Sequence, residues 1–286
     1  MKVKVAATQM SISKDIKKNI EKAIKMVKNC ANEGANVILL QELFKSTYFC
    51  QIESYDYFDL AEEENNSSFL KTFSKLAKEL SVVLPISFFE KSGNVYYNSI
   101  VVFDADGTNL GKYRKTHIPD GQCYEEKFYF TPGDTGFKVF NTTYGKIGVG
   151  ICWDQWFSET ARILTLKGAE MLLFPTAIGS EPILKTDSST HWQNVMKGHA
   201  AANIIPVIAS NRIGTEYEKD SSMTFYGKSF IAGPDGSLIK ELSKTEEGFL
   251  ISEFDLDLIN KTRRTWGIFR DRRPSMYKGI LEKDLS

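Results

Sequence analysis

Short apolar runs alternate with amphipathic stretches along most of the chain. Nine of these runs are too short for buried helices, rich in Val and Ile, and bounded by Gly, Pro or Asn. This pattern is typical of buried strands. The predicted strands cover residues 3–10, 36–44, 82–89, 98–107, 146–154, 169–176, 203–211, 228–236 and 248–256.

Four stretches between these runs have the periodicity of amphipathic helices. In the first, the apolar positions from Ile16 to Ala31 share one face while lysines fill the other, and Gly34 follows as a stop signal. The others are residues 67–80, 158–168 and 189–202. A serine at the start of each of these three is a candidate N-cap.

The order strand, helix, strand, helix, strand, strand occurs in each half of the chain. Residues 103–108 and 231–237 also resemble each other as strands that run into a tight turn. These features predict an α/β fold in which sheets with outer helices form a duplicated unit. We expect a single domain over residues 1–260 and, in the arginine-rich residues 261–286, a C-terminal arm packed on the body or on a partner subunit.

Composition narrows the class of protein. The 286 residues are 42% hydrophobic and 25% charged, which excludes disorder, and 36 basic side chains balance 36 acidic ones. No global field therefore draws the chain to nucleic acid or an anionic membrane, and no stretch reads as a signal peptide or membrane helix. Four scattered cysteines without a C-x-x-C pair, and only three histidines, predict no metal site and a cytoplasmic protein with reduced thiols.

Cys152 is the first candidate for chemistry. The strand over residues 146–151 ends in small residues and delivers Cys152 to a sharp turn before a helix. This is the arrangement of a nucleophile elbow, with Cys as the nucleophile and without the G-x-S-x-G spacing. A side chain at such a turn faces a cleft, next to backbone N–H groups able to hold an oxyanion. Taken alone, a cysteine after a strand is more often a small buried hydrophobe.

Two further strand ends carry charged residues. Glu42 directly follows a predicted buried strand, where a carboxylate is a useful proton acceptor. Lys115 lies in a turn after the strand at 98–107, and alone it reads as a solvated surface charge. Only the combination of the three residues favours catalysis.

The segments QELF, KYRKTHIPD and GVGICWDQWF, in this order, resemble the nitrilase (carbon-nitrogen hydrolase) superfamily, over nearly the whole chain. The resemblance implies a four-layer αββα sandwich and a triad in which Glu42 is the general base, Lys115 stabilises the tetrahedral intermediate and Cys152 is the nucleophile. It also implies a second glutamate near the triad, Glu126 in preference to Glu125. No cofactor is expected. The resemblance also implies association into a homodimer or a larger homo-oligomer.

The chemistry of the substrate fits these roles. An amide or ureido carbon is a poor electrophile, so the attack requires a thiolate. We expect the Lys115 ammonium to lower the pKa of the Cys152 thiol while Glu42 takes the proton. Glu42 then returns this proton to the leaving nitrogen and activates the water that hydrolyses the thioester-type intermediate.

The segments around the triad indicate a substrate. Residues 116–140, 175–182 and 187–214 resemble the branch of the superfamily that hydrolyses N-carbamoylputrescine to putrescine, ammonia and carbon dioxide in polyamine biosynthesis. Relatives that act on N-carbamoyl-D-amino acids carry an Arg pair soon after the nucleophile, whereas this chain reads Cys152-Trp-Asp-Gln-Trp. A substrate ammonium instead requires a carboxylate and aromatic walls. For the carboxylate we favour Glu181 over Asp187, and the aromatic candidates are Tyr48, Tyr124, Trp153 and Trp156.

Two alternatives remain at this point. One is another hydrolase of the same superfamily that acts on an anionic amide or ureido acid, as β-ureidopropionase and ω-amidase do. The other is a non-catalytic module that binds a small molecule or a partner protein. The intact set of Glu42, Lys115 and Cys152, each at a strand end, argues against the second.

Overall fold

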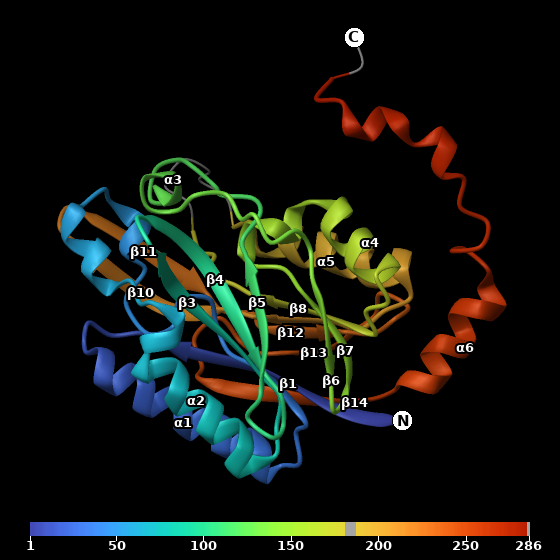
Figure 1. Cartoon of the computed structure of the whole chain (residues 1–286), viewed down its shortest axis with the longest axis horizontal. Coiled ribbons are helices and arrows are strands. Elements are labelled where there is room, and N and C mark those ends of the chain that lie inside the picture. Colours follow the sequence, from blue (N-terminus) through green and yellow to red (C-terminus); the bar gives the residue numbers. More distant parts are fainter. Residues whose placement is uncertain (181–186, 285–286) are drawn as a thin grey trace.

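A computed structural model describes residues 1–180 and 187–284. In its N-terminal half, two helices pack on the outer face of a β-sheet (Figure 1). Strand β1 (Lys2–Ser11) pairs in parallel with β2 (Val37–Leu39) and antiparallel with β14 (Gly248–Asp255). A bond from Ile38 N to Val83 O joins β2 to an antiparallel ribbon. The ribbon consists of β3 (Leu84–Ser92), β4 (Val95–Phe103) and β5 (Asn109–Arg114), and the helices are α1 (Ile16–Asn32) and α2 (Ser68–Leu80).

The second sheet has the order β13-β12-β9-β8-β7-β6. Helices α4 and α5 cover its outer face, and the hairpin β10–β11 continues the first sheet through β1 (Figure 1). Two further α-helices are α3 and α6, and short 3-10 helices lie between some of the elements. The bounds are β6 (Val139–Thr142), β7 (Gly145–Val149), β8 (Met171–Pro175), β9 (Val207–Ser210), β10 (Arg212–Glu218), β11 (Ser221–Tyr226), β12 (Phe230–Ala232), β13 (Leu238–Glu241), α3 (Glu126–Tyr129), α4 (Ser158–Leu166), α5 (Ser189–Asn203) and α6 (Leu256–Trp266).

Three apolar cores separate these four layers. Alternate residues of β1 point to opposite faces, so Ala6 packs under α1 and α2 while Val5 and Ala7 face the second sheet. A third core lies between the second sheet and α4 and α5, where Trp192 is fully buried. The chain therefore folds as the predicted αββα sandwich.

The two halves repeat one pattern of strands and helices. The turns predicted after residues 103 and 231 close in the same way, with Asp104 N bonded to Thr108 O at 2.9 Å and Gly233 N to Ser237 O at 2.8 Å. The first turn connects β4 to β5 and the second connects β12 to β13. The catalytic candidates follow strands β2, β5 and β7, at the strand ends where α/β proteins bind ligands.

The helix boundaries correct part of the sequence analysis. Ser67 caps α2 through a bond from Leu70 N at 2.9 Å, as predicted. Ser158 and Ser189, however, lie inside α4 and α5, so the prediction that they are N-caps is wrong. Helix α6 crosses the expected boundary at residue 260 and ends at Trp266. After α6 the chain passes α4, where the Phe269 ring lies 5.2 Å from the Arg162 guanidinium. Within the described residues, no helix has the length and apolarity needed to cross a bilayer.

Candidate active site

Glu42 is held in a turn that follows β2. Its side chain is fully buried, and Leu43 next to it adopts the left-handed region with φ of 48°. One carboxylate oxygen, Oε1, accepts bonds from Asn98 Nδ2 at 2.7 Å and Lys115 Nζ at 2.9 Å. The other oxygen, Oε2, is buried without a partner. Oε2 is therefore the oxygen of Glu42 that is open to a substrate or a proton.

Lys115 follows β5 and lies between two carboxylates. Its Nζ donates to Glu42 Oε1 at 2.9 Å and to Glu126 Oε2 at 2.6 Å, and its backbone N bonds to Asn98 O at 2.8 Å. Burial alone would lower the pKa of Lys115, but the charges of Glu126 and Glu42 raise it well above its usual value. The side chain is thus a fixed ammonium at the centre of the site.

Cys152 opens a short 3-10 helix, Cys152–Trp156, after β7. Its φ of 41° gives the sharp turn expected at this position, and its Sγ lies 3.8 Å from Ala177 O. The chain leading to Cys152 passes close to the Phe174 ring at Gly150, and a Cβ at this position would lie 2.6 Å from the ring. The thiol is therefore delivered by a backbone conformation that a side chain rarely adopts without support.

Several groups act on the pKa of the Cys152 thiol. Burial, and then the charge of Glu42, raise the pKa of Cys152 well above its usual value, while Lys115 opposes this shift. Lys115 therefore lowers the pKa of Cys152, as expected, but desolvation outweighs the ammonium and the net shift is upward. Without substrate, the nucleophile is held as a thiol next to a base, and its proton must leave during the attack.

Glu126 completes the buried cluster at the start of α3. Its Oε1 accepts a bond from the hydroxyl of Tyr48 at 2.6 Å, and Tyr48 is itself fully buried. Burial raises the pKa of Glu126 to about 7, with Lys115 opposing and Glu42 adding to the shift. One ammonium faces two carboxyl groups here, and burial makes Glu126 hold its proton more tightly than an exposed carboxyl does.

Residues 4–264 match the family model described as carbon-nitrogen hydrolase. The chain belongs to the carbon-nitrogen hydrolase family. It is 53% identical to N-carbamoylputrescine amidase of Oryza sativa subsp. japonica, over 99% of this chain and 96% of that protein. It is 50% identical to the citrullinase of Francisella tularensis subsp. tularensis, over 98% and 99%. The crystal structure of a carbon-nitrogen hydrolase from Helicobacter pylori G27 superposes with a TM-score of 0.92 at 39% identity, over 100% of both chains.

Asp154 joins the lysine loop of this carbon-nitrogen hydrolase to the nucleophile turn. Its Oδ1 accepts bonds from the backbone N of His117 at 3.0 Å and from His117 Nδ1 at 2.7 Å. Its Oδ2 accepts bonds from Tyr113 OH at 2.7 Å and from Ile151 N at 2.9 Å. Tyr113 and His117 lie two residues before and after Lys115. One buried carboxylate therefore fixes Lys115 relative to Cys152.

The aromatic candidates lie around the buried cluster. The rings of Tyr48 and Tyr124 meet edge to face with centroids 5.9 Å apart, and the Tyr124 hydroxyl accepts a bond from Gly179 N at 3.2 Å. Trp153 is 37% exposed and lies edge to face with Trp156 at 6.2 Å. Tyr48 and Tyr124 are thus placed together beside Glu126, while Trp153 reaches the surface.

The two acidic candidates for the substrate ammonium have different outcomes. Glu181 lies outside the described residues. Asp187 forms an ion pair with Lys244 and accepts a bond from Ser189 N at 2.9 Å at the start of α5. These bonds lower the pKa of Asp187 to about 2. Asp187 is therefore ionised, but its charge is already balanced.

Sequence reasoning missed two residues that hold Glu42. Asn98 begins a predicted strand, and Arg212 follows an apolar run directly. Both are fully buried, and a polar or charged residue inside or directly after an apolar run was the available signal. Among the described residues, no group of three or more His, Cys, Asp or Glu side chains is arranged to hold a metal ion.

Proposed function

We propose that this enzyme hydrolyses N-carbamoylputrescine to putrescine, ammonia and carbon dioxide, with Cys152 as nucleophile, Glu42 as base and Lys115 as oxyanion partner. The observation that carries the proposal is the buried cluster in which Lys115 bridges Glu42 and Glu126 beside Cys152. The 53% identity to N-carbamoylputrescine amidase over nearly the whole chain supports this choice of substrate.

The first half-reaction begins at the thiol of Cys152. Its Sγ attacks the ureido carbon while its proton passes to Glu42, whose Oε2 is the oxygen without a partner. Lys115 Nζ and the backbone N–H of Trp153, at the start of the 3-10 helix, face the developing oxyanion. Glu42 then gives its proton to the leaving nitrogen, and a covalent acyl–cysteine remains.

The second half-reaction releases the enzyme. Water attacks the acyl–cysteine, Glu42 takes a proton from this water, and the thiol of Cys152 is restored. When ammonia leaves first, the product of this step is the carbamate of putrescine, which breaks down to putrescine and carbon dioxide. One water is consumed in total, and the other order of leaving groups gives the same products. Glu42 serves both halves without a second base.

The charges around the cluster favour a substrate without an anionic end. Among the described residues, the cations next to the triad are Lys115, held by Glu42 and Glu126, and Arg212, held by Glu216. Neither has a free charge for a substrate carboxylate. Glu181 remains our choice for the substrate ammonium and Asp187 the second, with Tyr48, Tyr124 and Trp153 as the aromatic walls.

The test is ammonia release from N-carbamoylputrescine, measured beside citrulline, N-carbamoyl-β-alanine and glutaramate. Citrulline carries a ureido group on an alkyl chain but adds a carboxylate, so it tests the charge argument directly. We expect preference for N-carbamoylputrescine, and loss of turnover in Cys152→Ala with an unchanged melting curve. Faster turnover of citrulline or of either anionic substrate would overturn the substrate assignment, and turnover by Cys152→Ala would overturn the mechanism.

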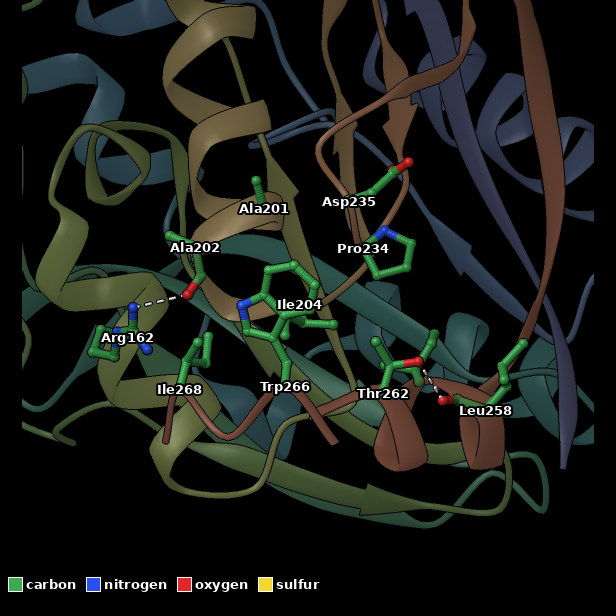
Figure 2. Close-up of a pocket in the computed structure, with 11 residues that line it drawn as sticks. Arg162, Ala201, Ala202, Ile204, Pro234, Asp235, Leu258, Thr262, Trp266 and Ile268 are labelled. Atoms are coloured by element: carbon green, nitrogen blue, oxygen red, sulfur yellow. Dashed lines mark hydrogen bonds between the residues drawn. The ribbon is translucent and has the colours of Figure 1, made fainter. Parts of the chain in front are cut away.

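Self-association is part of the proposal, and a groove beside α6 supports it. Figure 2 shows this groove, about 630 Å³, between the end of α5 and α6. Trp266 lies in its wall and is exposed. Beyond α6 the described residues up to 284 expose Met276, Ile280 and Leu281. Exposed apolar surface of this kind is typical of contacts between proteins, and a second copy of the chain is the occupant we propose.

Light scattering after size exclusion tests this association. We expect a mass of two or more chains, reduced by Trp266→Glu in the groove wall. Tyr55→Glu is the control, because Tyr55 is equally exposed but far from α6 in the sequence. A monomeric wild type would overturn the association.

The four cysteines are all unpaired, which supports the proposed cytoplasmic location.

A further inference from the structure

A second buried ion pair lies beside the triad and takes no part in the proposed chemistry. Arg212 and Glu216 lie on β10 and are 0% and 3% exposed. Arg212 Nη1 donates to both carboxylate oxygens of Glu216, at 2.9 and 3.1 Å. The guanidinium also lies 5.9 Å from the Tyr48 ring centroid and 5.4 Å from that of Phe225.

Stability alone does not account for this pair. Removing two charges from water costs several kcal/mol per ion, and apolar residues of similar volume are often as stable in such a position. An ion pair inside a core therefore calls for another role. The remaining bonds of the two side chains show which part of the molecule they hold.

Both side chains bind the main chain of the segment that carries the base. Arg212 Nη2 donates to Glu42 O at 2.8 Å and to Leu43 O at 2.9 Å. Glu216 Oε2 accepts the backbone N of Tyr48 at 2.5 Å. The ion pair thus grips both ends of residues 42–48. Glu42 binds Lys115 at one end, and at the other Tyr48 binds Glu126.

We propose that Arg212 and Glu216 are positioning residues, which hold residues 42–48 so that Glu42 and Tyr48 meet Lys115 and Glu126. The conformation of Leu43 makes such a hold necessary. Leu43, with φ of 48°, is a left-handed residue other than Gly, and such a conformation persists only where its surroundings fix it. The two carbonyl bonds from Arg212 fall on Leu43 and on the residue before it.

The geometry requires arginine in particular. The planar guanidinium sends Nη1 to Glu216 and Nη2 to two carbonyl oxygens at the same time. Lysine has one nitrogen at the end of its side chain and cannot match this fork. Arg212→Lys therefore keeps the charge and releases the segment.

The experiment has two readouts. The turnover readout rests on the proposed function, and the other readout needs no substrate. That readout is the rate at which iodoacetamide alkylates Cys152, followed by mass spectrometry of its peptide at fixed pH. Because the charge of Glu42 raises the pKa of the Cys152 thiol and alkylation requires the thiolate, the alkylation rate changes when Glu42 is displaced. We expect Arg212→Lys to change the alkylation rate and to lower kcat about 10²-fold, with kcat/KM falling equally, because a displacement of about 1 Å costs this much.

Arg263→Lys is the matched control. Arg263 also donates to two backbone carbonyls, Ile204 O at 2.9 Å and Ala169 O at 3.1 Å, but it lies on α6. We expect it to lose stability while Cys152 alkylation and kcat are retained. Equal losses of melting temperature in both variants, with alkylation and kcat per folded molecule unchanged in Arg212→Lys, would overturn the proposal.

A second variant decides the case if Arg212→Lys does not fold. Glu216→Gln keeps an oxygen for Tyr48 N and removes the charge that faces Arg212. A changed alkylation rate with an intact melting curve supports the positioning role, and an unchanged rate overturns it. If none of the four substrates is turned over, the alkylation rates still test the positioning role independently of the proposed function.

Discussion

Asp154→Asn tests whether one buried carboxylate aligns the cation with the nucleophile. Asp154 accepts four hydrogen bonds, two of them from His117 and one each from Tyr113 and Ile151. Asparagine keeps the shape but replaces one oxygen with an NH₂ group. In either orientation this NH₂ group faces a backbone N–H, of His117 or of Ile151, which loses its acceptor, while the Tyr113 hydroxyl or the His117 ring can turn to accept. At least one of the four bonds is lost, and the tie between Lys115 and the turn of Cys152 is broken on one side.

The expected size of the effect follows from these bonds. The lost bond to a charged acceptor is worth about 1.5–3 kcal/mol, and each of the three remaining bonds weakens by about 1 kcal/mol when its acceptor is neutral, so about 4.5–6 kcal/mol is removed. Relaxation of the left-handed Cys152 returns about 1–3 kcal/mol. The free energy of unfolding should therefore fall by about 3 kcal/mol, or roughly 6–12 °C in Tm for a chain of this size. We expect kcat to fall about 10²-fold, because alignment is lost as well.

The assay pairs urea unfolding with ammonia release. Asp106→Asn is the control, since Asp106 is exposed and accepts Thr108 N at 2.8 Å in a surface turn, and we expect no change in kcat. Tyr113→Phe removes one of the four bonds and should cost about 1.5–3 kcal/mol, which provides a milder variant if Asp154→Asn does not fold. A loss of stability in Asp154→Asn with wild-type kcat would refute the reasoning, because alignment would then not depend on this residue.

Two further predictions concern charges in the cluster. Because the pKa of Glu126 rises from about 4.5 unfolded to about 7 folded, the unfolded state binds fewer protons between these values and this group's stabilising contribution is lost as pH rises. The free energy of unfolding of the wild type, relative to that of Glu126→Gln, should therefore drop by about 3 kcal/mol between pH 4.5 and pH 7 in urea unfolding. Glu125→Gln is the control. A difference between wild type and Glu126→Gln that does not change with pH would contradict the shift. Asn98→Asp places a carboxylate against Glu42 Oε1 and should lower kcat at least about 10²-fold. Asn109→Asp is the control, because Asn109 binds Glu64 on the surface, and it should not lower kcat. Equal kcat values in the two variants would contradict a role of Asn98.

The sequence predicts the strands and helices that are buried and misses those that are not. All nine predicted strands exist, because their continuous apolar runs pack between two layers. Strands β5, β10, β11 and β13 were not predicted, since each is largely exposed or alternates polar and apolar residues. Strand β6 is only four residues long. A strand of this kind is defined by its hydrogen-bonded neighbours, which the local sequence does not specify.

The site divides in a similar way. Glu42, Lys115 and Cys152 stand at strand ends and could be named from their positions and from the family resemblance. Arg212 could not, because its bonds to Glu42 O and Leu43 O join residues 170 and 169 positions apart. The pairing of Asp154 with His117, over 37 positions, is equally invisible in the local pattern. Long-range polar contacts of this kind arise only once both strands occupy their places in the sandwich.

The strained residues explain why the site needs buried polar side chains. Leu43 and Cys152 are left-handed residues other than Gly, and each is adjacent to a catalytic position or occupies it. Arg212 binds the carbonyl of Leu43, and Asp154 binds Ile151 N directly before Cys152. When either support is removed, the turn relaxes and returns part of the lost free energy, whereas the displaced side chain regains none of its alignment. Variants of Arg212 and Asp154 should therefore lose more activity than their loss of folding stability alone would predict. Variants of ordinary core residues should not show this excess loss of activity.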